Sequence, residues 1–118
     1  MQRGPKFWAT LVAVALVAMA GLVLDRLHSE LAGTPLLVCE YGIGTDDDRE
    51  RAAYIERGLE IVNDRIARGV DVRGFFHWTG VDNYEWLHGY DVKFGIIDRD
   101  RNVRRSADVL RRAAVGPS

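Results

Sequence analysis

Two short apolar runs on either side of one long amphipathic segment constrain the fold of this chain most. Leu36–Cys39 is a continuous apolar run between a proline and a glycine-containing turn, which is typical of a strand buried on both faces. Residues 49–68 carry apolar side chains at three- and four-residue spacing, which predicts an amphipathic helix that Gly69 ends. Val72–Trp78 is the next predicted strand. A strand, a helix and a parallel strand predict a right-handed βαβ unit in an α/β fold.

The whole chain is short and ordinary in composition. Its 118 residues are enough to bury one modest core, and its net charge of −1 gives no reason to expect a nucleic-acid partner. Phe94–Asp98 with Asn102–Val103 suggests a small strand or hairpin, and Ser106–Ala114 a closing helix. The arginines near this helix fit a solvated face better than a phosphate site. They are Arg104, Arg105, Arg111 and Arg112.

Aromatic and acidic residues cluster after the second predicted strand. Trp78 is followed by Asp82-Asn83-Tyr84-Glu85-Trp86, inside a loop that runs from Gly80 to Tyr90. Indole faces stack on the C–H faces of sugar rings, and carboxylates accept hydrogen bonds from sugar hydroxyls. Glu40 adds a separate carboxylate at the end of the first strand. This combination indicates a sugar site.

Four motifs, in the same order, resemble the C-terminal part of glycoside hydrolase family 1, the β-glucosidase and β-galactosidase type. Leu36–Gly42 stands where that family has an apolar strand ending in Thr-Glu-Asn-Gly, and Gly69–Trp78 resembles its next strand, which ends in Trp-Ser. Asp82–Trp86 matches Asp-Asn-Phe-Glu-Trp, and Lys93-Phe94-Gly95 matches Arg-Phe-Gly. The resemblance covers residues 21–114.

The resemblance implies a fold and an activity. The fold would be the last two βα units of a (β/α)8 barrel, preceded by an apolar N-terminal helix. A whole barrel of this kind has roughly 250 residues. The activity would be that of a retaining β-glycosidase without a cofactor, acting on a β-glycoside or small sugar. Such enzymes use two carboxyl groups roughly 5–5.5 Å apart, a nucleophile and a general acid/base.

The resemblance also implies residue roles. Glu40 would be the nucleophile, Glu85 would accept hydrogen bonds from sugar hydroxyls, and Trp86 would donate its indole N–H to a hydroxyl. Trp78 would form the platform under the sugar ring, and Phe94 would line the outer wall. Packing at the barrel end is the alternative role of both tryptophans. The neighbouring pair Asp82-Asn83 is expected to brace the loop through local hydrogen bonds.

The sequence departs from the family pattern in ways that affect activity. Cys39 and Tyr41 replace a Thr and an Asn beside Glu40, and Thr79-Gly80-Val81 replaces Ser-Leu-Leu. The Asn-Glu-Pro motif that carries the family's acid/base does not occur in these 118 residues. We therefore expect the isolated chain to be inactive. The alternative is a non-catalytic remnant, held in a membrane or docked to the missing half of the barrel, with at most weak carbohydrate binding.

The N-terminal segment allows three interpretations. Phe7–Leu24 is an apolar run broken only by Thr10, after the basic residues Arg3 and Lys6. It is just long enough to span a bilayer as an anchor, and it also fits a cleaved signal peptide. Residues 21–31 resemble the family's helix before the nucleophile strand, so residues 1–20 would otherwise be replaced sequence, from a truncation, frameshift or alternative start.

Each interpretation has a consequence for domains and localisation. All three divide the chain into an apolar segment, 1–20, and a partial barrel, 21–118. The protein would be cytoplasmic if residues 1–20 are replaced sequence, and membrane-bound or exported if they are an anchor or a signal. A buried barrel helix is disfavoured, because an uncharged run from 7 to 24 is too uniform for a helix with a solvent face.

Two further residue types argue against other chemistry. The three histidines have no ligand spacing, and the acids at 46–48 fit a helix start better than a calcium loop, so no metal site is expected. Cys39 is the only cysteine and is expected to be a small buried apolar residue rather than a nucleophile.

Overall fold

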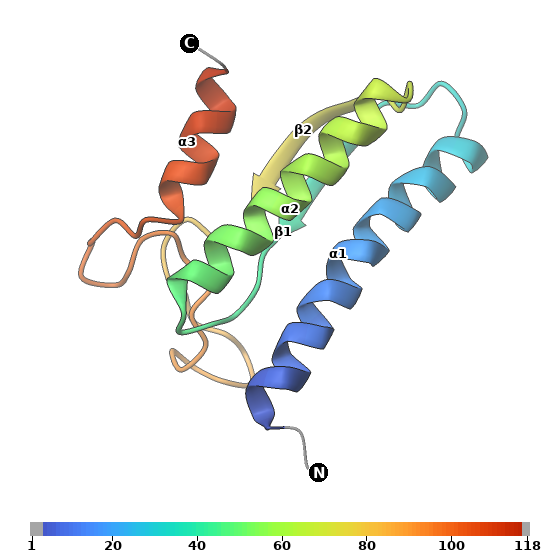
Figure 1. The fold of residues 1–118 in the computed structure, drawn as a ribbon. Coiled ribbons are helices and arrows are strands. Elements are labelled where there is room, and N and C mark those ends of the chain that lie inside the picture. Colours follow the sequence, from blue (N-terminus) through green and yellow to red (C-terminus); the bar gives the residue numbers. More distant parts are fainter. Residues whose placement is uncertain (1–3, 117–118) are drawn as a thin grey trace.

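The computed structural model describes the backbone of residues 4–116, and the side chains of residue 4 and residues 11–116. Within residues 4–116, three helices and two strands follow one another (Figure 1). They are α1 (Pro5–Glu30), β1 (Leu36–Tyr41), α2 (Asp48–Ala67), β2 (Val72–His77) and α3 (Ala107–Val115). β1 and β2 pair in parallel with α2 as their crossover, which confirms the predicted strand–helix–strand unit.

The crossover helix α2 has the predicted start and face. Asp47 caps it by accepting a hydrogen bond from the Arg49 N–H at 2.9 Å, and two acids in the first turn complement the helix dipole. Its buried face includes Ile55, which is completely inaccessible, and Val62. Val62 belongs to a core cluster that also contains Leu24, Leu36 and Val70. This cluster joins α1, α2 and the N-terminal end of the sheet.

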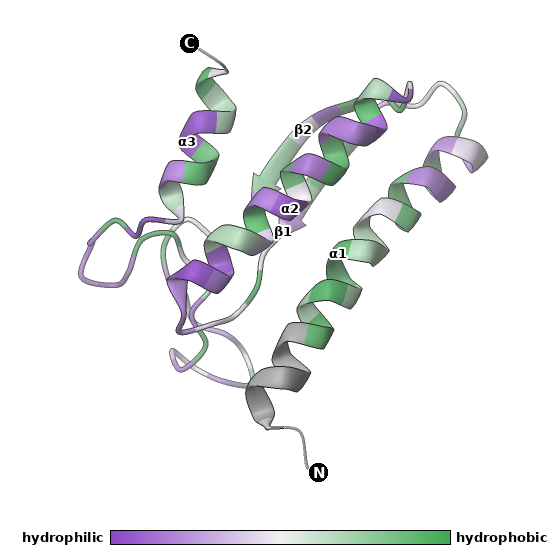
Figure 2. Cartoon of the chain, in the orientation of Figure 1, coloured by the Kyte–Doolittle hydropathy of each residue, from purple (hydrophilic) through white to green (hydrophobic). Residues whose placement is uncertain are grey.

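One continuous helix, α1, runs through the predicted boundary between residues 20 and 21. Leu24 is buried in the core, and Asp25 makes two hydrogen bonds of 2.9 Å with the guanidinium of Arg65 on α2. Between residues 11 and 20 the helix is almost entirely apolar (Figure 2), and most of these side chains are exposed. By length and composition, Leu11–Glu30 could cross a membrane, a property shared by some soluble core helices and by signal sequences.

The face of the sheet opposite α2 is open in the described part of the chain. Leu37 and Phe76 are 57% and 56% exposed, and Cys39 is exposed as well. The prediction of a buried Cys39 is therefore wrong. The reason is that a strand is buried on both faces only when other elements cover its second face, and within residues 4–116 none covers this one.

The predicted small hairpin near residues 94–103 is present only as isolated bridges. Ile97 pairs with Val103 in antiparallel fashion and with Val81 in parallel fashion. Figure 1 shows that this segment and the loop after β2 gather at the same end of the fold, beside the N-terminal end of α2.

Candidate functional site

The parallel pairing of β1 and β2 brings two predicted site residues to one edge. Tyr41 pairs with His77, and the Trp78 N–H donates to the Tyr41 carbonyl oxygen at 3.1 Å. The chain passes so close at Gly42 that a Cβ there would collide with the Trp78 carbonyl oxygen. Glu40, which precedes Tyr41 in β1, and Trp78, which follows the last residue of β2, therefore lie at the same carboxyl end of the sheet.

Glu40 has an open environment. Its side chain is exposed, and among the described residues it makes no hydrogen bond or ion pair. It borders a cavity of about 420 Å³ between α1, α2 and β1, whose lining includes neither Trp78 nor Glu85. In the described part of the chain, the candidate nucleophile is accordingly accessible rather than enclosed.

Tyr41, which replaces the family's Asn, turns away from the open face. Its ring stacks on Tyr54 of α2 at a centroid distance of 4.5 Å, and its hydroxyl donates to the Tyr54 carbonyl oxygen at 3.1 Å. Burial raises the pKa of the Tyr41 hydroxyl, so it stays a neutral hydrogen-bond donor. This substitution anchors the end of β1 to α2.

Asp82 braces the loop through partners 13 and 22 positions away instead of the predicted local hydrogen bonds, and the Oδ1 atom of its neighbour Asn83 is buried without a partner among the described residues. The Asp82 carboxylate accepts from the Gly95 N–H at 2.7 Å and pairs with both terminal nitrogens of Arg104, at 3.0 and 2.7 Å. The two side chains are only 7% and 17% exposed. Burial by itself would raise the pKa of Asp82, but the hydrogen bonds from Arg104 and Gly95 outweigh it and lower that pKa. The prediction of a solvated Arg104 is therefore wrong, because this residue precedes α3 and points into the loop.

Glu85 and Trp86 lie at the tip of the loop. Glu85 and Gly89 exchange two backbone hydrogen bonds of 2.7 Å, which close a tight turn in which Gly89 has a φ of +59°. The Oε1 atom of Glu85 is buried without a hydrogen-bond partner among the described residues. Trp86 is 92% exposed. Among the described residues, the tip therefore carries a carboxylate oxygen that is buried without a partner and an indole that is exposed.

Phe94 connects the loop to the strand ends. Its carbonyl oxygen accepts from the Thr79 N–H at 3.4 Å and lies 3.1 Å from Nε2 of His77. Its ring lies against the turn after β1, where a Cβ on Gly44 would come within 3.1 Å of it. Phe94 is thus brought to the same end of the sheet as Glu40 and Trp78.

The structure adds a residue that the sequence reasoning missed. Arg51 is 1% exposed, pairs with Asp48 at 2.7 Å, and donates to the carbonyl oxygens of Thr45 and Lys93. The signal was the spacing of positions 51, 55, 58 and 62, which form the buried face of α2. A buried arginine needs hydrogen-bond acceptors, and the carbonyl oxygens of Thr45 and Lys93, in the loops after β1 and β2, supply them.

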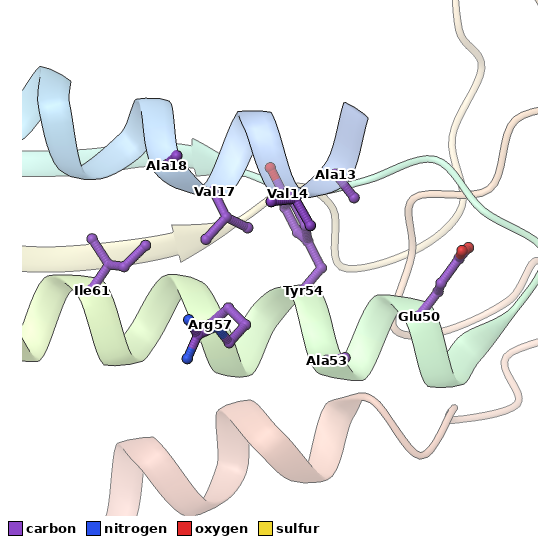
Figure 3. Close-up of a pocket in the computed structure, with 9 residues that line it drawn as sticks. All are labelled: Ala13, Val14, Val17, Ala18, Glu50, Ala53, Tyr54, Arg57 and Ile61. Atoms are coloured by element: carbon purple, nitrogen blue, oxygen red, sulfur yellow. The ribbon is translucent and has the colours of Figure 1, made fainter. Parts of the chain in front are cut away.

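Two other features lie away from this edge. A cavity of about 370 Å³ opens between α1 and α2, where the two helices diverge, and contains none of the predicted site residues (Figure 3). Within residues 4–116, no group of three or more His, Cys, Asp or Glu side chains gathers in a way that would hold a metal ion.

Comparison with known proteins identifies the family to which this chain is related. The family model for glycosyl hydrolase family 1 matches residues 9–114. The β-galactosidase of Sulfolobus acidocaldarius is 41% identical over 73 residues, which are 62% of this chain and 15% of the relative. The bifunctional β-D-glucosidase/β-D-fucosidase of Bifidobacterium breve is 41% identical over 100 residues, with coverage of 72% and 22%. The chain thus spans a fifth or so of these relatives.

Solved structures agree with the sequence relatives. A β-glycosidase from Pyrococcus horikoshii superposes with a TM-score of 0.72 at 36% identity, over 77% of this chain and 22% of that one. A β-glucosidase from Thermotoga maritima in complex with glucoimidazole gives 0.73 at 26% identity, over 78% and 25%.

The fold and the residues at its strand ends define a partial (β/α)8 barrel of the β-glycosidase class, which confirms the predicted fold. The chain belongs to glycosyl hydrolase family 1. The match begins at residue 9, inside the predicted segment 1–20, so the family relationship extends into α1. The boundary at residue 20, with its three interpretations, stays a prediction. Residues 1–3 and the side chains of residues 5–10 lie outside the described part.

Proposed function

We propose that this chain carries the nucleophile portion of a retaining β-glycosidase active site for β-glucosides and β-galactosides. The observation that supports it most is that Glu40 and Trp78 lie at the carboxyl ends of two paired parallel strands, the edge at which barrel enzymes keep their sites. The names of the relatives agree with this substrate class.

Each residue has a defined role in this proposal. The Glu40 carboxylate attacks the anomeric carbon and forms a covalent glycosyl–enzyme, while a second carboxyl group protonates the leaving oxygen and then activates water. Trp78 is the platform for the sugar ring and Phe94 its outer wall. Glu85 accepts hydrogen bonds from sugar hydroxyls through its carboxylate. The indole N–H of Trp86 donates to a hydroxyl.

The isolated chain is inactive in this proposal, because its 118 residues contain no Asn-Glu-Pro motif to carry the acid/base. General acid catalysis contributes about 10²–10⁴-fold. A β-glucoside with a poor alkoxide leaving group, which needs protonation to depart, should therefore show no turnover above buffer when mixed with the purified chain.

The nucleophile can be tested inside a complete barrel. Residues 36–116 would replace the matching part of the Bifidobacterium breve relative, and hydrolysis of an aryl β-glucoside would be measured. We expect Glu40→Gln to abolish turnover and Glu60→Gln, an exposed carboxylate of α2, to leave it unchanged. A 2-fluoro glycoside should label the peptide that contains Glu40. An active Glu40→Gln chimera, or a label on another peptide, would contradict the assignment.

A second candidate function is a non-catalytic remnant docked to another polypeptide. The exposed Leu37 and Phe76 on the open sheet face favour it, since contiguous apolar surface of this kind marks an interaction site or an aggregation risk. Sedimentation velocity separates the two functions. A chain that stays monomeric at micromolar concentration, together with an active chimera, supports the enzyme portion over the remnant.

A further inference from the structure

The loop that carries the proposed sugar ligands is held by this chain's own residues. Its two ends run side by side, because the Asp82 N–H donates to the Ile97 carbonyl oxygen and the Ile97 N–H donates to that of Gly80, both at 3.0 Å. The Ile96 N–H adds a bond of 3.2 Å to the Thr79 carbonyl oxygen. Residues 79–97 therefore form a loop whose two ends are joined by backbone hydrogen bonds.

A buried ion pair locks the base of this loop. The Asp82 carboxylate holds the Gly95 N–H on one oxygen, and the fork of Arg104 spans both oxygens. Arg104 also donates from a side-chain nitrogen to the Gly95 carbonyl oxygen, and from its backbone N–H to that of Ile96 at 2.8 Å. A planar guanidinium that meets a carboxylate in two places fixes direction as well as distance.

Arg51 makes a second attachment, on the other side of the loop. It donates to the Lys93 carbonyl oxygen at 2.9 Å, and that same oxygen accepts the Thr45 N–H at 3.0 Å. Its partner Asp48 accepts from the Ser106 hydroxyl at 2.6 Å and from the Ser106 N–H at 3.0 Å. The loop is thereby tied to the start of α2 and to the segment that enters α3.

We propose that Asp82, Arg104 and Arg51 are positioning residues that hold Glu85, Trp86 and Phe94 in their binding geometry without help from the rest of the barrel. The identity of the ligand in this proposal rests on the proposed function. The geometric part stands on the contacts above, all of which lie within residues 45–106. None of the three residues touches the sugar, and each acts through the loop backbone.

Hydrogen exchange on the isolated chain tests the geometric part. Asp82→Asn keeps the shape of the side chain and removes the charge that Arg104 binds. We expect the amides of the loop base to exchange at least tenfold faster, with amides in the buried face of α2 unchanged. Arg104→Gln should accelerate exchange of the same amides as Asp82→Asn does. Arg104→Lys should keep part of the protection that Arg104→Gln loses. Asp108→Asn breaks only the exposed pair with Arg111 and is the matched control.

Two results would overturn the geometric part. One is wild-type exchange of the loop amides in Asp82→Asn. The other is equal acceleration in α2, which would show a general loss of stability instead of a released loop. Arg51→Met offers an independent check, because it should release the Lys93 end while the amide of Gly95 stays protected by Asp82.

Kinetics in the Bifidobacterium chimera test the ligand. Asp82→Asn should raise KM for the aryl glucoside at least tenfold and change kcat less, because the reacting carboxylates stay in place while the sugar contacts are lost. Asp82→Asn with unchanged KM overturns the positioning role if Glu85→Gln still raises KM. If Glu85→Gln is also silent, the proposed sugar subsite fails, whatever the exchange data show.

Discussion

Gly58→Ala tests how α2 supports the end of the strand that carries Glu40. Gly58 is buried in the middle of α2, and its lack of a side chain makes room for the ring of Tyr41. A Cβ at this position would lie 2.5 Å from two carbon atoms of that ring and 2.9 Å from its hydroxyl oxygen. Contacts of this length force the ring to move.

The expected change combines three effects. Alanine is favoured over glycine in a helix by about 1 kcal/mol, which alone would stabilise the variant. Overpacking of a well-filled core costs about 1–3 kcal/mol. Displacement of the ring also removes the hydrogen bond from the Tyr41 hydroxyl to the Tyr54 carbonyl oxygen, worth about 1 kcal/mol. The net result is a loss of about 1–3 kcal/mol in the free energy of unfolding, because the steric and hydrogen-bond costs exceed the propensity gain.

Urea unfolding followed by far-UV circular dichroism measures this loss. Asn63→Ala, at an exposed position of the same helix, is the control and should stabilise by about 0.5 kcal/mol through propensity alone. In a Tyr41→Ala background the ring is gone, so Gly58→Ala should become neutral or stabilising. A stabilising Gly58→Ala in the wild-type background would refute the steric argument.

Three further outcomes are expected. Burial lowers the pKa of His77 despite hydrogen bonds to backbone oxygens. The stability that this neutral ring contributes is therefore present above about pH 6.5 and is lost as the pH falls through the lowered pKa. In His77→Gln, the urea midpoint should depend less on pH between pH 7 and 5. Asp82 has a lowered pKa too, so its contribution is present above about pH 4 and lost below it, which Asp82→Asn should abolish. Phe76→Ser should reduce self-association in sedimentation velocity without reducing stability, since its side chain is 56% exposed.

The strand–helix–strand unit could be predicted because its signals are local. The apolar period of α2 and the apolar run of β1 can each be recognised from residues that are close in the sequence. The observed helix α2 begins one residue before the predicted one. The loop contacts could not be predicted from spacing. Asp82 and Arg104 are 22 positions apart, and nothing in either sequence neighbourhood specifies that they meet.

Burial of single residues was harder to predict than the type of element. Arg51 follows the apolar period of α2, yet a charged residue is normally placed on the solvent face, so it was missed. Cys39 is the last residue of an apolar run, yet its exposure depends on whether other strands and helices cover the sheet. The candidate site residues were recognised from motifs, whereas the contacts that hold them became visible only in three dimensions.

The packing of α1 constrains what the apolar N-terminal segment can do. A Cβ at Gly21 would come 2.7 Å from an Arg65 nitrogen, and Leu24 is 6% exposed, so the helix contacts α2 closely from residue 21 onward. Residues 5–20 remain, and at about 1.5 Å per residue they extend about 24 Å. A bilayer core is about 30 Å thick. Residues 7–24 therefore cannot span a bilayer while Gly21 and Leu24 stay packed in the fold.

We accordingly expect the folded chain to insert no transmembrane helix into lipid vesicles. Purified chain would be mixed with phosphatidylcholine vesicles, treated with protease, and examined for a protected fragment that ends near Asp25. Leu16→Asp is the informative variant, because this side chain is 46% exposed in the fold, whereas aspartate at the centre of a membrane helix costs about 3 kcal/mol. Unfolding free energy should change by less than about 0.5 kcal/mol, as for other exposed positions. A protected fragment that disappears in Leu16→Asp would show that α1 leaves α2 to enter the bilayer, and that the packed helix is not the dominant state.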